Sequence, residues 1–203
     1  EGDPLWALGT AGLATAHEHQ DWWIRRLQAD WPALWSEVLA AANERPPMCL
    51  RVNQRRASGP AYLERLLAAG IEAELAVATG LGSQAIALKE PCAVHMLPDF
   101  DQGHVSVQDL SAQRAAPLLL QTRLPSSARV LDACSAPGGK AAHLLELADL
   151  DLLCVDSSPE RSARITQTLA RLQLNAKVQV ADAGEPASWW DRRPFDAILL
   201  DAP

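Results

Sequence analysis

The chain has 203 residues, of which 48% are hydrophobic and 21% are charged. This composition is typical of one or two packed domains and excludes a disordered or fibrous chain. The formal net charge of −7 weighs weakly against nucleic acid binding, but such binding depends on local patches rather than on the total.

No stretch of the sequence approaches the roughly 18 consecutive apolar residues that a membrane-spanning helix needs. The first residues also lack the basic and apolar regions of a signal peptide. We therefore expect a cytoplasmic protein with no membrane partner. The four cysteines and five histidines show no metal-ligand spacing, so we predict reduced thiols and no metal site.

Residues 1–45 are predicted to form a helical segment rich in tryptophan. Apolar side chains recur there at steps of three and four residues, from Trp22 to Val38. Pro32 falls inside this pattern and is expected at the first turn of a second helix. Because exposed tryptophan is costly, we expect this stripe to be core rather than an RNA-stacking surface.

Residues 46–125 are predicted to form a small α+β domain followed by a connecting helix. The expected elements are a strand at 48–53, a helix at 58–70, strands near 71–77 and 84–88 that are separated by a turn at 79–82, and a helix at 108–121. Arginines cluster around the first of these strands. Such a cluster is either a solvated face or an RNA-binding surface, and the candidates for RNA contact are Arg51, Arg55 and Arg56.

Residues 126–203 alternate between apolar strands and helices. Strands are expected at 130–132, 152–156, 176–181 and 195–201, and helices at 139–148 and 159–173. Strands without polar alternation indicate a parallel sheet that is covered on both faces. The predicted fold class is α/β, with the first half of a Rossmann-like sheet. Because four strands with a raw edge are an unlikely complete domain, we expect this chain to be part of a longer protein.

An aspartate stands at the end of each predicted strand of this sheet: Asp132, Asp156, Asp182 and Asp201. Ligands of open α/β sheets bind at the carboxyl ends of the strands. Asp156 follows the second strand, near the offset at which an acidic residue binds a ribose 2′-hydroxyl, and Asp182 could reach an adenine amino group. The alternative is that these aspartates are ordinary strand-end and helix-cap residues.

The turn at 134–140 leads from the first of these strands into a helix. Its glycines allow close backbone approach, and the helix N-terminus offers free N–H groups. Cys134 and Ala141 depart from the Walker A pattern, and the glycine spacing departs from the dinucleotide fingerprint. An amino-acid carboxylate fits this turn better than a diphosphate does, so an NAD-dependent oxidoreductase is the weaker alternative.

The sequence Ala-Pro-Gly-Gly-Lys at 136–140, together with Asp156, Asp182 and Asp-Ala-Pro at 201–203, resembles the Fmu/Sun and NSUN family of RNA cytosine-C5 methyltransferases. The stretches at 50–53 and 105–113 are also similar to that family, especially to its bacterial members that modify 16S ribosomal RNA. The resemblance covers roughly residues 20–203. It implies a Rossmann-like fold, S-adenosyl-L-methionine as cofactor and 16S ribosomal RNA as partner. The cofactor-binding residues that it implies are Cys134, Ser135, Ala136, Pro137, Gly138, Gly139, Lys140, Asp156, Asp182 and Asp201.

The family's reaction requires two cysteines, of which one attacks cytosine C6 and the other releases the product. The resemblance implies that both lie beyond residue 203 and that Cys134 belongs to the cofactor loop. We therefore expect no catalytic residue in this chain and no turnover by it alone. We also expect the protein to be a monomer. A non-catalytic RNA-binding module built on the small domain is the alternative function.

Overall fold

The computed structural model describes residues 13–76 and 84–202. The chain divides into two compact units, Glu1–Pro46 and Pro47–Pro203. The turn predicted at 79–82 and the start of the predicted N-terminal helix lie outside the described residues. Within the described ranges, no helix is long and apolar enough to cross a membrane. The second unit contains two sheets, and the domain boundary predicted near residue 125 stays a prediction.

The N-terminal unit contains α2 (Leu13–His17), α3 (Asp21–Asp30) and α4 (Trp35–Asn43). Pro32 lies in the turn between α3 and α4, so the predicted helix start at this proline is wrong. The Trp31 N–H bonds to the Leu27 carbonyl as α3 ends, and α4 begins only at Trp35.

The predicted tryptophan core of this unit is also wrong in part. Ile24, Leu27 and Leu39 form the core, and Trp35 packs against them. Trp22 and Trp31 remain 64% and 58% exposed. The three-residue step from Ile24 to Leu27 defines the buried face of α3, and Trp22 lies off that face.

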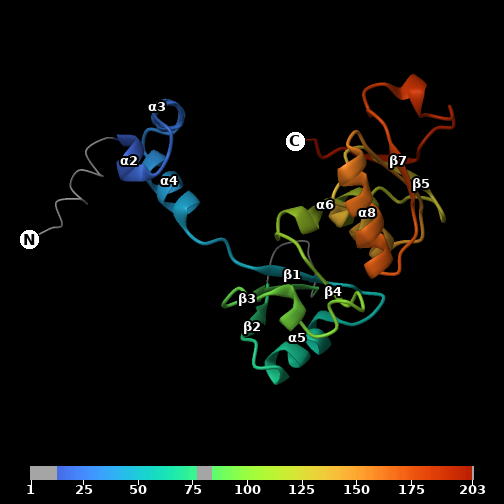
Figure 1. Cartoon of the computed structure of the whole chain (residues 1–203), viewed down its shortest axis with the longest axis horizontal. Helices are drawn as coiled ribbons and strands as arrows, with labels where there is room; N and C mark the ends of the chain where they lie inside the picture. Colours follow the sequence, from blue (N-terminus) through green and yellow to red (C-terminus); the bar gives the residue numbers. More distant parts are fainter. Residues whose placement is uncertain (1–12, 77–83, 203) are drawn as a thin grey trace, which may run out of the picture. The chain divides into compact units, whose positions relative to one another are not determined.

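The first sheet of the second unit is antiparallel with the order β2-β3-β1-β4 (Figure 1). Its elements, with the helix that covers it, are β1 (Cys49–Val52), α5 (Gly59–Ala68), β2 (Ala73–Leu75), β3 (Ala85–Leu88) and β4 (Val105–Val107). Leu50 and Val52 of β1 pack with Tyr62 and Leu66 of α5 in one core. The three-residue strand β4 was not predicted, although it pairs with β1 along its length.

The second sheet is parallel with the order β7-β6-β5-β8, which places β5 and β6 at its centre. Its elements in chain order are β5 (Arg129–Asp132), α7 (Gly139–Leu147), β6 (Asp151–Asp156), α8 (Pro159–Arg171), β7 (Lys177–Val180) and β8 (Ala197–Leu199). The connection between the sheets contains two short helices, η2 (Ala112–Arg114) and α6 (Ala115–Leu120), in place of the longer predicted helix. A short helix, η1 (Val94–Met96), precedes β4, and another, η3 (Pro186–Ser188), precedes β8. The predicted Rossmann-like arrangement is confirmed.

The two faces of the parallel sheet are covered differently. Val130 and Leu152 pack in the main core with residues of α6, α7 and α8. The alternate residues Leu131 and Val155 point to the opposite face, where Trp189 and Phe195 pack against them. Within the described chain, helices therefore cover one face, and a loop cluster lies on the face where the second helical layer was expected.

Candidate cofactor site

The turn between β5 and α7 is held by the backbone. Ser135 N–H bonds to the Val155 carbonyl at 3.0 Å, and Gly138 N–H bonds to the Ser135 carbonyl at 2.7 Å. Gly138 has φ of +98°, and a Cβ there would lie 3.2 Å from Ile165 Cα in α8. Glycine is required because both its left-handed backbone and its packing exclude a side chain.

Helix α7 begins directly after this turn. Its first helical hydrogen bond joins Ala142 N–H to the Gly138 carbonyl at 2.9 Å. The preceding N–H groups of Gly139, Lys140 and Ala141 therefore have no partner within the helix. Such a helix start attracts anions.

Asp156 ends β6 and faces the turn. One carboxylate oxygen accepts a 3.2 Å hydrogen bond from Ala136 N–H, and the other accepts a 3.0 Å bond from Ser158 N–H. The Arg161 guanidinium lies 3.4 Å from the same carboxylate, whose side chain is 3% exposed. The carboxylate is therefore fixed, and Asp156 lines the cavity described next.

A cavity of about 620 Å³ opens at the carboxyl ends of the strands. Apolar side chains including Leu131, Val155 and Phe195 line it, and Asp156 and Asp182 supply carboxylates. The Asp182 carbonyl accepts a 2.9 Å hydrogen bond from Trp189 Nε1, and its carboxylate accepts a 2.8 Å hydrogen bond from Gly184 N–H. An apolar cavity of this size with few polar groups suits a nucleoside-sized ligand.

A second cavity of about 240 Å³ lies on the other side of the turn. Cys134 borders both cavities, whereas Lys140, Asp201 and Gln108 border the smaller one. Lys140 Nζ lies 2.5 Å from Asp201 Oδ2, so the loop lysine and the last strand's aspartate form an ion pair. The cofactor-binding residues predicted from sequence thus come together at one edge of the sheet.

These residues fit the nucleoside and the amino acid of S-adenosylmethionine. The rigid carboxylate of Asp156 matches ribose hydroxyls, and the start of α7 matches an amino-acid carboxylate. Their individual roles remain predictions. Trp189 and Phe195 also line the large cavity, which was not predicted from the sequence. Their position between the last two strands, as large apolar side chains, was the sequence feature that could have indicated this role.

None of the three cysteines with a perturbed pKa suits nucleophilic chemistry. Burial, with a smaller effect of Asp156 and Asp132, raises the pKa of Cys134. Burial raises the pKa of Cys49 and raises that of Cys154 to about 12. A high pKa keeps the thiol protonated at neutral pH, which is consistent with the prediction that the nucleophile is none of these.

The arginines predicted to contact RNA have partners inside the protein. Arg51 is 1% exposed and binds Glu146, which contradicts an RNA contact by this residue. Arg55 binds the Leu145 carbonyl and Asp149, and Arg56 binds Gln173, but both arginines remain accessible. RNA contact by Arg55 and Arg56 stays a prediction. No group of three possible metal ligands occurs in the described part of the chain.

The parallel sheet, the glycine turn and the aspartates at the strand ends define the Rossmann-like fold that is typical of S-adenosylmethionine-dependent methyltransferases. Two family models match the chain: the RsmF/B-like ferredoxin-like domain over residues 19–95, and the 16S rRNA methyltransferase RsmB/F over residues 119–203. The chain belongs to this RsmB/F methyltransferase family.

Curated relatives agree with the family models. Ribosomal RNA small subunit methyltransferase B from Pseudomonas syringae pv. tomato is 47% identical over 187 residues, which cover 91% of this chain and 40% of that protein. The enzyme of the same name from Xylella fastidiosa strain 9a5c is 48% identical over 183 residues, covering 90% of this chain and 42% of the relative. The chain thus spans less than half the length of these relatives.

Solved structures share the fold. A methyltransferase homologue from Pyrococcus horikoshii matches with a TM-score of 0.78 and 24% identity, over 94% of this chain and 61% of that one. NSun6 from the same organism matches with a TM-score of 0.76 and 15% identity, over 91% and 70% of the two chains. At such identities the likeness concerns the fold alone.

Proposed function

We propose that the protein containing this chain methylates C5 of a cytosine in 16S ribosomal RNA, as a cytoplasmic monomer that uses S-adenosylmethionine. The observation that carries this proposal is the convergence of Asp156, the Gly138 turn and the Lys140–Asp201 pair at one sheet edge. Family membership and the names of the relatives support the choice of RNA.

The cofactor, when bound, supplies a methyl group on a positively charged sulfur. Asp156 binds the ribose hydroxyls, and its two backbone hydrogen bonds hold the carboxylate in one orientation. The free N–H groups that begin α7 bind the methionine carboxylate. The apolar wall of the large cavity, including Leu131 and Val155, packs against adenine and excludes water.

The target base lies in the smaller cavity, beside Lys140 and Asp201. A carboxylate accepts from an exocyclic amino group and an ammonium donates to a ring carbonyl, so this ion pair complements the polar edge of cytosine. In the family's reaction a cysteine thiolate attacks C6 of the base. The resemblance implies that this cysteine lies beyond residue 203, so we expect the longer protein to supply it.

Transfer of a labelled methyl group to 16S transcripts by the full-length protein tests the proposal. We expect the label on cytosine C5, and loss of transfer in Lys140→Met and Asp201→Asn variants of that protein. Label on a base nitrogen or a ribose oxygen would refute the proposal. RNA binding without any transfer would instead favour the non-catalytic module, an alternative that no contact among residues 13–76 and 84–202 specifically supports.

A further inference from the structure

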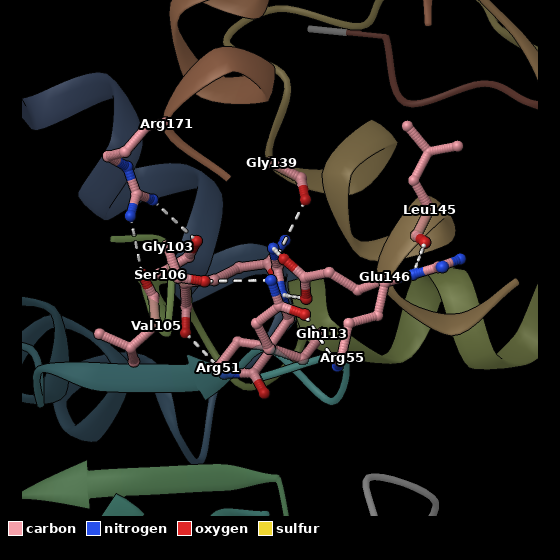
Figure 2. Close-up of polar contacts among 12 residues, drawn as sticks. Arg51, Arg55, Gly103, Val105, Ser106, Gln113, Gly139, Leu145, Glu146 and Arg171 are labelled. Atoms are coloured by element: carbon pink, nitrogen blue, oxygen red, sulfur yellow. Dashed lines mark hydrogen bonds and ion pairs between the residues drawn. The ribbon is translucent and has the colours of Figure 1, made fainter. Parts of the chain in front are cut away.

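Arg51 of β1 crosses from the small antiparallel sheet to helix α7 of the parallel-sheet half. The alternation along β1 turns Leu50 and Val52 toward the α5 core and Arg51 toward the opposite face. Its Nε and Nη2 donate to the two carboxylate oxygens of Glu146 at 2.8 and 2.7 Å, and both side chains are buried. This is the two-pronged geometry in which arginine binds carboxylate most strongly (Figure 2).

The remaining nitrogen of Arg51 reaches the cofactor turn. Nη1 donates to the Gly139 carbonyl at 2.9 Å (Figure 2). It also donates to Gln108 Oε1 at 2.5 Å. The Gly139 carbonyl shares a rigid peptide plane with Lys140 N–H. Fixing the carbonyl therefore fixes the direction of one of the free N–H groups at the start of α7.

The small sheet also holds the residues around Arg51 in place. Gln113 is buried and donates to the carbonyls of Gln108 and Leu50 at 2.9 and 3.3 Å. Gln108 N–H donates to the Cys49 carbonyl at 3.0 Å. The Arg51 guanidinium thus lies between Glu146 on one side and Gln108 on the other, and Gln108 is itself held by β1 and by Gln113.

From these contacts we propose that Arg51 and Glu146 are positioning residues for the cofactor. They transmit the placement of the small antiparallel sheet to the Gly139–Lys140 peptide, so that the N–H groups beginning α7 are aligned before the cofactor binds. The inference rests on the proposed function for the identity of the ligand. It gives the small sheet a part in cofactor binding besides any contact with RNA.

Arg171 provides a matched control at the same junction. It crosses in the opposite direction, from the end of α8, and donates to the Val105 carbonyl and to Ser106 Oγ, both at 3.0 Å (Figure 2). It also donates to the Phe100 carbonyl at 2.6 Å. Like Arg51 it makes several hydrogen bonds across the junction, although it is only half-buried, and none of these bonds reaches the turn at 134–140.

The test compares Arg51→Lys with Arg171→Lys in the full-length protein. The dissociation constant of S-adenosylmethionine is measured by calorimetry, and amide hydrogen exchange is measured over residues 134–142. We expect Arg51→Lys to raise the dissociation constant about tenfold, the scale of one lost hydrogen bond, and to speed exchange at the turn. Arg171→Lys should change neither, even if both variants lose thermal stability. Methyl-transfer kinetics should show a raised KM for S-adenosylmethionine with the KM for RNA unchanged.

Unchanged cofactor affinity and exchange in Arg51→Lys would overturn the proposal, as would an increase confined to the KM for RNA. If Arg51→Lys fails to fold, the double variant Arg51→Met with Glu146→Leu replaces the buried pair by apolar side chains of similar size, which such sites often tolerate. We expect it to fold and to show the same loss of affinity; wild-type affinity would overturn the proposal. If the wild-type protein methylates no cytosine, the proposed function fails, but the binding and exchange results still decide the role of Arg51.

Discussion

Ser135 Oγ donates a 3.0 Å hydrogen bond to Asp132 Oδ2, and both side chains are buried at the end of β5. The hydrogen bond favours the charged carboxylate, but burial outweighs it and raises the pKa of Asp132 from 3.8 to about 6. A carboxyl group whose protonated form the folded protein stabilises thus lies next to the cofactor turn. This preference is a cost at neutral pH, where the carboxylate is charged.

Replacing Asp132 should change how stability depends on pH. Because the native state binds this proton more tightly than the unfolded chain, the Asp132 contribution lowers the free energy of unfolding as pH rises from 3.8 to about 6. Asp132→Asn removes that contribution. As pH rises through this range, the free energy of unfolding of the variant should therefore increase relative to that of the wild type, by up to about 3 kcal/mol. Urea denaturation at a series of pH values measures the difference.

The Ser135→Ala variant supplies the control for this prediction. Loss of the hydroxyl removes a contact that lowers the Asp132 pKa. The pH range over which Asp132 lowers the free energy of unfolding should therefore extend to higher pH. Parallel stability curves for the wild type and Asp132→Asn would contradict the raised pKa.

Gly138 and Gly139 are adjacent but should respond oppositely to alanine. Gly138→Ala places a Cβ in the left-handed region and 3.2 Å from Ile165 Cα, so we expect a loss of about 1–3 kcal/mol in the free energy of unfolding. Gly139→Ala meets Gln108 Nε2 at an ordinary 3.6 Å and lies in α7, where alanine is favoured, so stability should be kept. Urea denaturation of both variants checks this, and equal losses would contradict it.

The second sheet was predictable because parallel strands are buried on both sides and therefore stand out as apolar runs. The strand at 152–156 and the helices near 139 and 159 match the observed elements within a few residues. The aspartates that follow these strands led to the prediction of a cofactor site at this edge, because the carboxyl ends of parallel strands meet there.

The contacts between elements were not predictable from local pattern. The alternation of β1 shows that Arg51 faces away from Leu50, but it does not show that α7 covers that second face. An arginine that would be exposed on a one-sided sheet is therefore buried, and it forms an ion pair with Glu146. The strand β4 escaped prediction because three residues carry too little periodicity to distinguish a strand from a loop.

Asp156 should control cofactor affinity more strongly than any other single carboxylate at this edge. If Asp156 accepts hydrogen bonds from the ribose hydroxyls, as we propose, Asp156→Asn removes the charge of that acceptor. Hydrogen bonds to charged groups are worth about 1.5–3 kcal/mol, so affinity for S-adenosylmethionine should fall roughly 10- to 100-fold. Calorimetry on the full-length protein measures the change. Asp151→Asn, at the exposed opposite end of the same strand, is the matched control and should bind normally. Equal affinity in the two variants would exclude Asp156 as the ribose ligand.

Arg55 and Arg56 are the accessible candidates for RNA contact on the small sheet's side of the protein. If each neutralises one phosphate, Arg55→Ala or Arg56→Ala should weaken binding to a 16S transcript and lower the slope of log affinity against log salt by about 0.7 for single-stranded RNA. Arg55 also holds the Leu145 carbonyl and Asp149, so its variant should lose some stability as well, whereas Arg56 bonds a single described side chain, Gln173. Arg164→Ala, which removes an exposed charge paired with Glu160 on α8, is the control and should leave the slope unchanged. Filter binding across a salt series measures this slope for the wild type and each variant.

An unchanged slope in both the Arg55 and the Arg56 variant would mean that these arginines, like Arg51, make contacts within the protein rather than with RNA.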